Sequence, residues 1–245
     1  LNEGTRRLLR ARDHSEKGAS RMMAMPRSLL EAYSAAAVQL YFLEDGEGAG
    51  RALEMGLAEV DWMGIQPESR GHLDVAVLFA DAGRPDRARE RLAAYREEVP
   101  PEVREKPERR GALLLAEGAI ARAEGAPAAA LDLYREGRAL LPGCSLCGLL
   151  EMGETFESWA RPDSAVQVYE AYLGSKDMFR SQHDVLKLHR VLLGLGRSYE
   201  VLERPDRALD YLGWQLELWS NVDLGLQPRV EALRDKVRIL REAQR

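Results

Sequence analysis

The sequence predicts an all-α protein: a right-handed α-solenoid of about five helical hairpins followed by a capping helix. The tetrapeptide Pro-Asp-Arg-Ala at 85–88 returns at 205–208, as Pro-Asp-Ser-Ala at 162–165, and as a degenerate Pro-Ala-Ala-Ala at 127–130. The final alanines of these copies are 42, 35 and 43 residues apart along the chain. Spacings of this size indicate one repeated supersecondary unit. No alternating run of apolar residues predicts a strand.

A second small residue is coupled to the first in every copy. It stands twelve residues before each alanine, as Ala76, Gly118, Gly153 and Gly196. Four residues after each alanine comes a large residue: Leu92, Tyr134, Tyr169 and Leu212. A small residue on each of two helices lets their backbones approach closely where they cross, while the large side chains fill the remaining space. Each copy is therefore predicted to be a helical hairpin.

The turn inside each hairpin has its own chemistry. In the first copy Gly83 suits the left-handed residue that ends a helix, and Pro85 is preorganised for the first turn of the next helix. Asp86 then lies at the positive end of that second helix. The other copies keep this arrangement with small changes, so the four turns are predicted to be alike.

The remaining elements follow from these landmarks. Residues 1–26 are expected to form a polar linker or a frayed helix, and residues 27–245 one solenoid domain. Its hairpins are predicted at 28–62, 70–98, 108–140, 145–174 and 185–220, with a cap at 227–243. In the cap, apolar residues recur at intervals of three and four, which is typical of a helix with one buried face: Val230, Leu233, Val237 and Leu240.

The chain resembles a tetratricopeptide repeat (TPR) protein over about residues 70–220. It has that family's leucine-glycine, tyrosine and alanine positions in Leu195-Gly196, Tyr199 and Ala208. The C-terminal part also resembles the TPR tails of bacterial multidomain signalling proteins, such as serine/threonine kinases and transcriptional regulators. The resemblance implies a non-catalytic module that binds a peptide or a neighbouring domain, as the sensor or docking region of a larger protein.

In TPR arrays the first helix of each hairpin lines a concave groove, and this geometry nominates partner-binding residues here. The candidates are Arg70, Leu73, Arg122, Glu154, Glu157, Arg190, Leu193, Arg197 and Glu200. The planar fork of arginine suits a carboxylate, so a protein or peptide is the expected partner. For any single arginine, solvent exposure or pairing with a glutamate on a neighbouring helix is the more ordinary role. For Glu154 and Glu157 the ordinary role is a solvated helix face.

Cys144 and Cys147 are the one motif that could carry chemistry. They follow Pro142-Gly143 at the expected start of a first helix, where the helix dipole would favour a thiolate. A disulfide or redox pair is one interpretation, and half of a metal site shared between two subunits is another, since the chain offers no second cysteine pair and no nearby histidine pair. The ordinary alternative is a pair of packed, structural thiols. A purely architectural or oligomerising spacer is the remaining function for the chain.

The rest of the sequence supports no enzyme and no cofactor. The four histidines, His14, His72, His183 and His189, lack the spacing of a metal or catalytic motif and are expected to be surface or interface side chains. A net charge of −5 removes the usual footprint of a nucleic-acid-binding protein. No apolar run of membrane-spanning length occurs, and no membrane insertion is expected of this chain. A cytoplasmic location is favoured, and the absence of an initial methionine fits a piece of a longer protein.

Overall fold

The structure is a computed structural model in which residues 26–177 and 180–244 are described. These residues form helices and the turns between them, with no strand, which confirms the all-α prediction. Within this described part, no helix combines the length and apolarity needed to cross a membrane. The predicted linker over residues 1–26 lies outside the described residues, except for Pro26. The chain divides into two compact units between Pro142 and Gly143.

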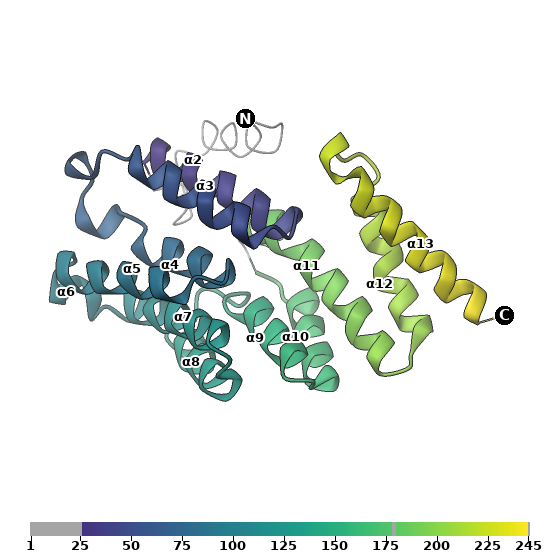
Figure 1. Cartoon of the computed structure of the whole chain (residues 1–245). Coiled ribbons are helices and arrows are strands. Elements are labelled where there is room, and N and C mark those ends of the chain that lie inside the picture. Colours follow the sequence, from purple (N-terminus) through teal and green to yellow (C-terminus); the bar gives the residue numbers. More distant parts are fainter. Residues whose placement is uncertain (1–25, 178–179, 245) are drawn as a thin grey trace. The chain divides into compact units, whose positions relative to one another are not determined.

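The described part of the first unit contains three helix pairs and the short helix α6 (Figure 1). Its helices are α2 (Arg27–Ala37), α3 (Gly46–Ala58), α4 (His72–Asp81), α5 (Pro85–Glu98), α6 (Pro101–Arg104), α7 (Pro107–Ala123) and α8 (Pro127–Ala139). A π-helical turn, Val38–Phe42, continues α2, and two 3-10 turns precede α4. Helix α2 packs on α3, α4 on α5 and α7 on α8, and α4 also packs against α7. The first helices of two successive pairs are therefore neighbours.

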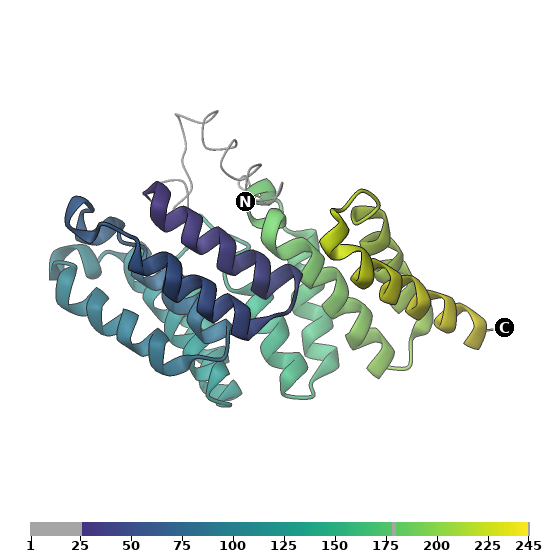
Figure 2. The same cartoon turned by 45° about the horizontal axis from the view of Figure 1, so that its top comes forward.

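The second unit has two helix pairs and a final helix (Figure 2). Its helices are α9 (Leu149–Ser158), α10 (Pro162–Gly174), α11 (Arg180–Val201), α12 (Pro205–Leu218) and α13 (Gln227–Ala243). Helix α11 packs against both α9 and α10, and α13 packs against α12. The cap has the predicted bounds, and its buried face consists of Val230, Leu233 and Val237. The prediction of one continuous array over residues 27–245 stays a prediction.

The four hairpin turns share one backbone geometry, as the repeated tetrapeptide predicts. Each second helix begins with a proline. Each turn contains one left-handed residue: Gly83, Gly125, Ala160 and Glu203. The residue after it donates its N–H to the carbonyl five positions earlier, for example Arg84 to Phe79 at 2.8 Å and Arg204 to Tyr199 at 2.9 Å. This bond closes the last turn of the first helix.

The predicted small-residue crossings are also present. The four alanines of the tetrapeptide are fully buried: Ala88, Ala130, Ala165 and Ala208. A Cβ atom on Gly118 would lie 2.6 Å from Cε1 of Tyr134, and one on Gly153 would lie 2.6 Å from Cδ1 of Tyr169. The large side chain on the second helix thus occupies the space that the glycine leaves.

Two helix starts differ from the prediction for the second unit. Helix α9 begins at Leu149 rather than near residue 145, because Gly148 adopts a left-handed conformation with φ of 74°. Helix α11 begins at Arg180 rather than near residue 185. The guanidinium of Arg180 donates to the carbonyls of Tyr172, Leu173 and Ser175, which lie at and just beyond the last turn of α10, and its Nε lies 3.0 Å from Asp184. These bonds stabilise an extra helical turn before residue 185.

Candidate functional site

Helices α9 and α11 are joined by a row of ion pairs, which we call the charge ladder: Glu151–Lys187, Glu154–Arg190 and Glu157–Arg197. The nearest nitrogen and oxygen atoms are 2.6 Å apart in the first two pairs. In the third, Nε and Nη2 of Arg197 donate to the two carboxylate oxygens of Glu157 at 2.9 and 3.1 Å. Intervals of three residues on α9 and of three and seven on α11 keep each side of the ladder on one helix face.

Arg197 is the most exposed member of the charge ladder. The side chains of Glu154 and Arg190 are each 17% exposed, whereas that of Arg197 is 49% exposed. Burial by itself raises the pKa of the Glu151 carboxyl group, but the charge of Lys187 and the hydrogen bond from it outweigh burial and lower that pKa to about 2. The Glu151 end is therefore a buried ion pair, and the Arg197 end is open to solvent.

Glu157 has a second partner from the second helix of its own hairpin. The hydroxyl of Tyr169 donates to Oε2 of Glu157 at 2.5 Å. Burial raises the pKa of Tyr169 well above its ordinary value, and the negative charges of Glu154 and Glu157 raise it further. Tyr169 therefore stays a neutral hydrogen-bond donor. Glu200, also on α11, pairs with Lys236 of α13 at 2.8 Å.

The first unit contains comparable pairs at two predicted positions. Arg70 lies 2.5 Å from Glu98 and also donates to the carbonyls of Trp62 and Ile65 at 2.9 and 3.1 Å. Arg122 of α7 pairs with Asp81 of α4, and the side chains are only 15% and 5% exposed. Both arginines therefore connect elements within this unit.

The predicted apolar candidates are not on an open surface. Leu73 is 2% exposed and belongs to the core of the first unit, which corrects its assignment to a partner-binding face. Leu193 is partly buried against a cluster that includes Leu212, Trp219 and Val230. The seven charged candidates all form ion pairs within their units, which is the ordinary role weighed for the arginines. Their binding of a partner stays a prediction.

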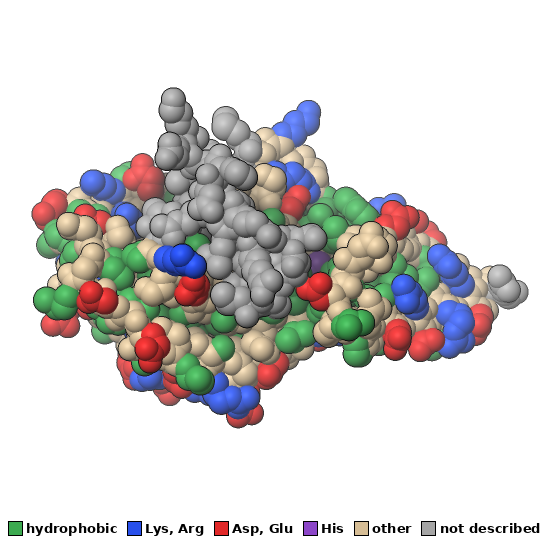
Figure 3. All heavy atoms as spheres, turned by 90° about the horizontal axis from the view of Figure 1, so that it is seen from above, with side chains coloured by type: hydrophobic (Ala, Val, Ile, Leu, Met, Phe, Trp, Pro, Cys, Tyr) green, Lys and Arg blue, Asp and Glu red, His purple; other side chains and the backbone are tan. Residues whose placement is uncertain are grey.

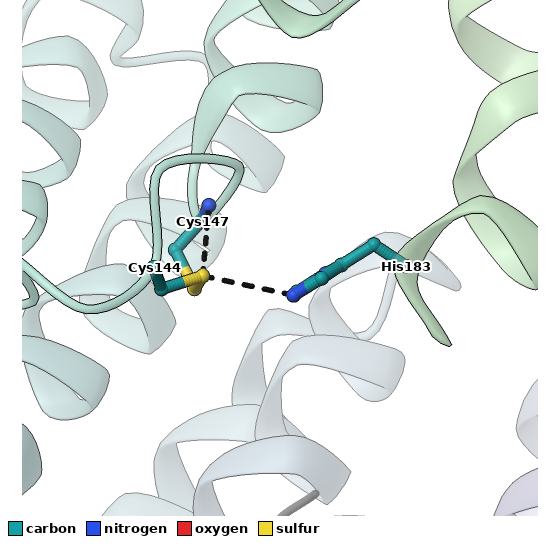
Figure 4. A group of neighbouring side chains, drawn as sticks. All are labelled: Cys144, Cys147 and His183. Atoms are coloured by element: carbon teal, nitrogen blue, oxygen red, sulfur yellow. Dashed lines mark hydrogen bonds between the residues drawn. A yellow bond between two sulfur atoms is a disulfide. The ribbon is translucent and has the colours of Figure 1, made fainter. Parts of the chain in front are cut away.

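The two cysteines lie in the loop that precedes α9 (Figure 4). The structure joins Cys144 and Cys147 in a disulfide rather than leaving two packed free thiols. The backbone N–H of Cys147 donates to Sγ of Cys144 at 3.2 Å. The imidazole of His183 points toward this pair from α11, with its Nε2 atom 3.6 Å from Sγ of Cys144.

A separate set of hydrogen bonds holds the cysteine loop against the segment before α11. Oδ2 of Asp177 accepts from the backbone N–H of Ser145 at 2.8 Å and from its hydroxyl at 3.0 Å. The hydroxyls of Ser145 and Ser175 are 2.5 Å apart. Ser145, one of the two residues between the cysteines, is therefore held against the segment just before α11.

Two of the histidines are buried, whereas surface or interface positions are expected from the sequence. His72 and His189 are 4% and 3% exposed; His72 hydrogen-bonds Glu98 at 3.0 Å, and the ring of His189 lies 6.0 Å from that of Trp219. His14 lies outside the described residues. Burial lowers the pKa of His183, and the nearby charge of Lys187 lowers it further, so its imidazole is neutral near pH 7.

Sequence reasoning missed the contribution of His183 and Lys187 to these arrangements. On α11 they are four residues apart, and so are their respective neighbours Cys147 and Glu151. The matching intervals are compatible with a contact between α11 and the segment from Cys147 to Glu151. The sequence does not show that these two segments face each other. Compared with protein-family models, curated proteins and solved structures, the chain has no significant match.

Proposed function

We propose that the chain is a non-catalytic protein-interaction module built from TPR hairpins. It docks a peptide segment or a neighbouring domain on the faces of its first helices, as the sensor or docking region of a larger bacterial signalling protein. Repetition supports the proposal: four hairpins share the same turn bond, the same proline start and the same buried alanine. Repeat units of this kind stack to form extended binding surfaces.

The observation that carries the proposal is the charge ladder. It places carboxylates and basic groups of neighbouring first helices side by side on one face of the second unit, with Arg197 half exposed. Because the paired side chains are already oriented, a peptide that contacts them immobilises few additional side chains, and the entropy cost of binding is smaller. A ligand with both acidic and basic residues matches such a face, because its half-exposed cation, Arg197, is paired with the carboxylate of Glu157.

The surface charge fits a protein ligand better than a nucleic acid. Where described residues are visible in Figure 3, Lys and Arg side chains are interspersed with Asp and Glu side chains. A nucleic-acid-binding surface gathers basic residues along one groove or stripe, because the affinity comes largely from phosphate contacts. Interspersed charges instead favour recognition of a partner with its own pattern of both signs.

Exchanging the two charges of one rung tests this function. The variant Glu157→Arg/Arg197→Glu keeps an ion pair but reverses its direction on the binding face; it also removes the acceptor of the Tyr169 hydroxyl, so circular dichroism checks that it is folded. Peptides selected from a display library on the wild-type chain are expected to bind this variant at least about tenfold more weakly, a loss of ~1.4 kcal/mol. The affinities are measured by fluorescence anisotropy with the synthetic peptides.

A matched control exchanges an ion pair on an exposed part of α13. Asp235 and Arg238 lie 3.2 Å apart there, and both side chains are more than half exposed. The Asp235→Arg/Arg238→Asp variant is expected to bind the selected peptides like wild type. Failure to select any peptide, or equal binding by both exchanged variants, would contradict the proposal. Light scattering of the isolated chain identifies the alternative, an oligomerising spacer, if the chain self-associates through this face.

A further inference from the structure

Three potential metal ligands converge at the loop before α9. The Sγ atoms of Cys144 and Cys147 and a ring nitrogen of His183 all lie within 4.8 Å of one another, and each side chain is half buried. In the described residues this is the one group of three or more His, Cys, Asp and Glu side chains arranged closely enough to hold an ion. Thiolate and imidazole are the ligands that zinc prefers.

The observed sulfur-to-nitrogen distance is the one a zinc ion requires. With Zn–S bonds of about 2.3 Å and Zn–N bonds of about 2.0–2.1 Å at tetrahedral angles, a sulfur and a nitrogen ligand are about 3.6 Å apart. Nε2 of His183 is 3.6 Å from Sγ of Cys144. Two sulfur ligands of the same ion are about 3.8 Å apart, so the disulfide must open before the ion can bind. The histidine is therefore already at ligand distance from Cys144, and the Cys147 sulfur, which is within 4.8 Å of it, has to separate from that of Cys144.

The charge ladder and the Ser145 contacts hold the two halves of this group together. One helical turn beyond the ligands, Glu151 and Lys187 join α9 to α11 at 2.6 Å. On the other side, Asp177 binds Ser145 between the cysteines. Neither contact uses a cysteine sulfur, so both can persist when the disulfide is reduced. The N–H of Cys147 that donates to Sγ of Cys144 would stabilise a thiolate there.

We propose that reduction of the Cys144–Cys147 disulfide creates a zinc site with ligands from Cys144, Cys147 and His183. A dithiol or a phosphine supplies the two electrons, and the S–S bond breaks to give two thiols. The dithiol gives its two protons and becomes a disulfide, whereas the phosphine takes the oxygen of a water molecule, whose two protons go to the thiols. Binding of Zn²⁺ then releases the two thiol protons to solvent and forms two Zn–S bonds and one Zn–N bond. Water takes the fourth position. An oxidant of the azo class, such as diamide, accepts two electrons from the two thiolates and two protons from solvent; the S–S bond re-forms, both Zn–S bonds break and the ion is released, so the metal state of this loop follows the redox state.

The test uses the full chain reduced with a phosphine, which leaves no competing thiol in solution. Reduced wild type is dialysed against Zn²⁺ and then metal-free buffer, and its metal content is measured by mass spectrometry. Co²⁺ replaces Zn²⁺ in a parallel sample, since sulfur-to-cobalt charge-transfer absorption reports thiolate ligation. We expect one ion per reduced chain and none in a chain oxidised with diamide.

Variants of the histidine decide whether it is a ligand. His183→Ala is expected to weaken Zn²⁺ binding at least about tenfold, and His183→Cys to restore it, because cysteine supplies another ligand. Gln182→Ala, a neighbouring change on α11, is expected to leave binding unchanged. Circular dichroism checks that each variant is folded. The proposal is wrong if the reduced wild type binds no zinc, or if either His183→Ala or Cys144→Ser binds zinc as tightly as wild type.

Discussion

The ring of Tyr169 is held between two glycines, and adding one methyl group to Gly153 tests this packing. Tyr169 is fully buried on α10. A Cβ on Gly153 of α9 would lie 2.6 Å from its Cδ1 and Cζ atoms, and a Cβ on Gly194 of α11 would lie 2.6 Å from its Cε2 atom. The ring therefore cannot move away from α9 without approaching α11. The Gly153→Ala variant should destabilise the second unit.

The size of the effect follows from two opposing contributions. Overpacking a well-filled core costs typically 1–3 kcal/mol, and the upper part of that range applies because the ring is confined on both sides. Alanine in place of glycine inside a helix contributes about 1 kcal/mol in the opposite direction. We therefore expect Gly153→Ala to lower the free energy of unfolding by about 2 kcal/mol.

Urea denaturation followed by circular dichroism measures this change. The matched control is Gly213→Ala, the same substitution inside α12, where an added Cβ meets no atom within 4 Å. That variant gains only the helical preference of alanine and should be more stable than wild type by about 1 kcal/mol. Replacing Tyr169 by leucine, the residue that Leu212 supplies opposite Gly196 in the next hairpin, should relieve part of the Gly153→Ala defect.

Gly153→Ala should thus lower the free energy of unfolding, and Gly213→Ala should raise it. The packing argument fails if Gly153→Ala is as stable as wild type, or if Gly213→Ala is destabilised by a similar amount. It also fails if Tyr169→Leu and Gly153→Ala are simply additive, because residues in contact should show a coupling energy.

Three further outcomes are expected. The pKa of Glu151 is lowered from 4.5 to about 2 in the folded chain, so its stabilising contribution is present above pH 4.5 and is lost as the pH falls toward 2. Acid titration of unfolding should show a loss of up to about 3 kcal/mol over that range, which Glu151→Gln removes. Arg122→Ala leaves the carboxylate of Asp81 buried without this partner and should lower the free energy of unfolding, measured in urea, by about 3 kcal/mol. Arg135→Ala, at an exposed pair, should lower it by under about 1 kcal/mol. Equal losses would contradict the burial argument. Reducing Cys144–Cys147 without metal should cost at most about 2 kcal/mol, because the closed loop is short, and a larger loss would show that the disulfide holds more than this loop.

The hairpins could be predicted from the sequence because their determinants are local. A proline at the start of a helix, a left-handed residue before it and small residues at fixed separations act within about 20 residues. The four turns and the buried alanines follow from them. The cap could also be located, since the apolar interval from Val230 to Val237 defines one helix face whatever packs on it.

The ends of the helices were harder to predict, because long-range bonds set them. Arg180 begins α11 by donating to carbonyls at and just beyond the end of α10, a contact that no short-range pattern reveals. The resemblance-based choice of partner-binding residues likewise could not distinguish a surface leucine from Leu73 in the core. Burial depends on which neighbouring helix covers a face, and that is a tertiary property.

By itself, then, the sequence determined a repeated helical hairpin, its turns and its capping helix, because each depends on the conformational preferences of neighbouring residues. Only the tertiary structure decided which charges meet. Glu154 and Arg190 are 36 residues apart in the chain but form one rung between α9 and α11. The same packing brings His183 to the disulfide at 3.6 Å. Contacts between helices depend on how successive hairpins stack, and stacking is set by the shapes of whole buried faces rather than by any single motif.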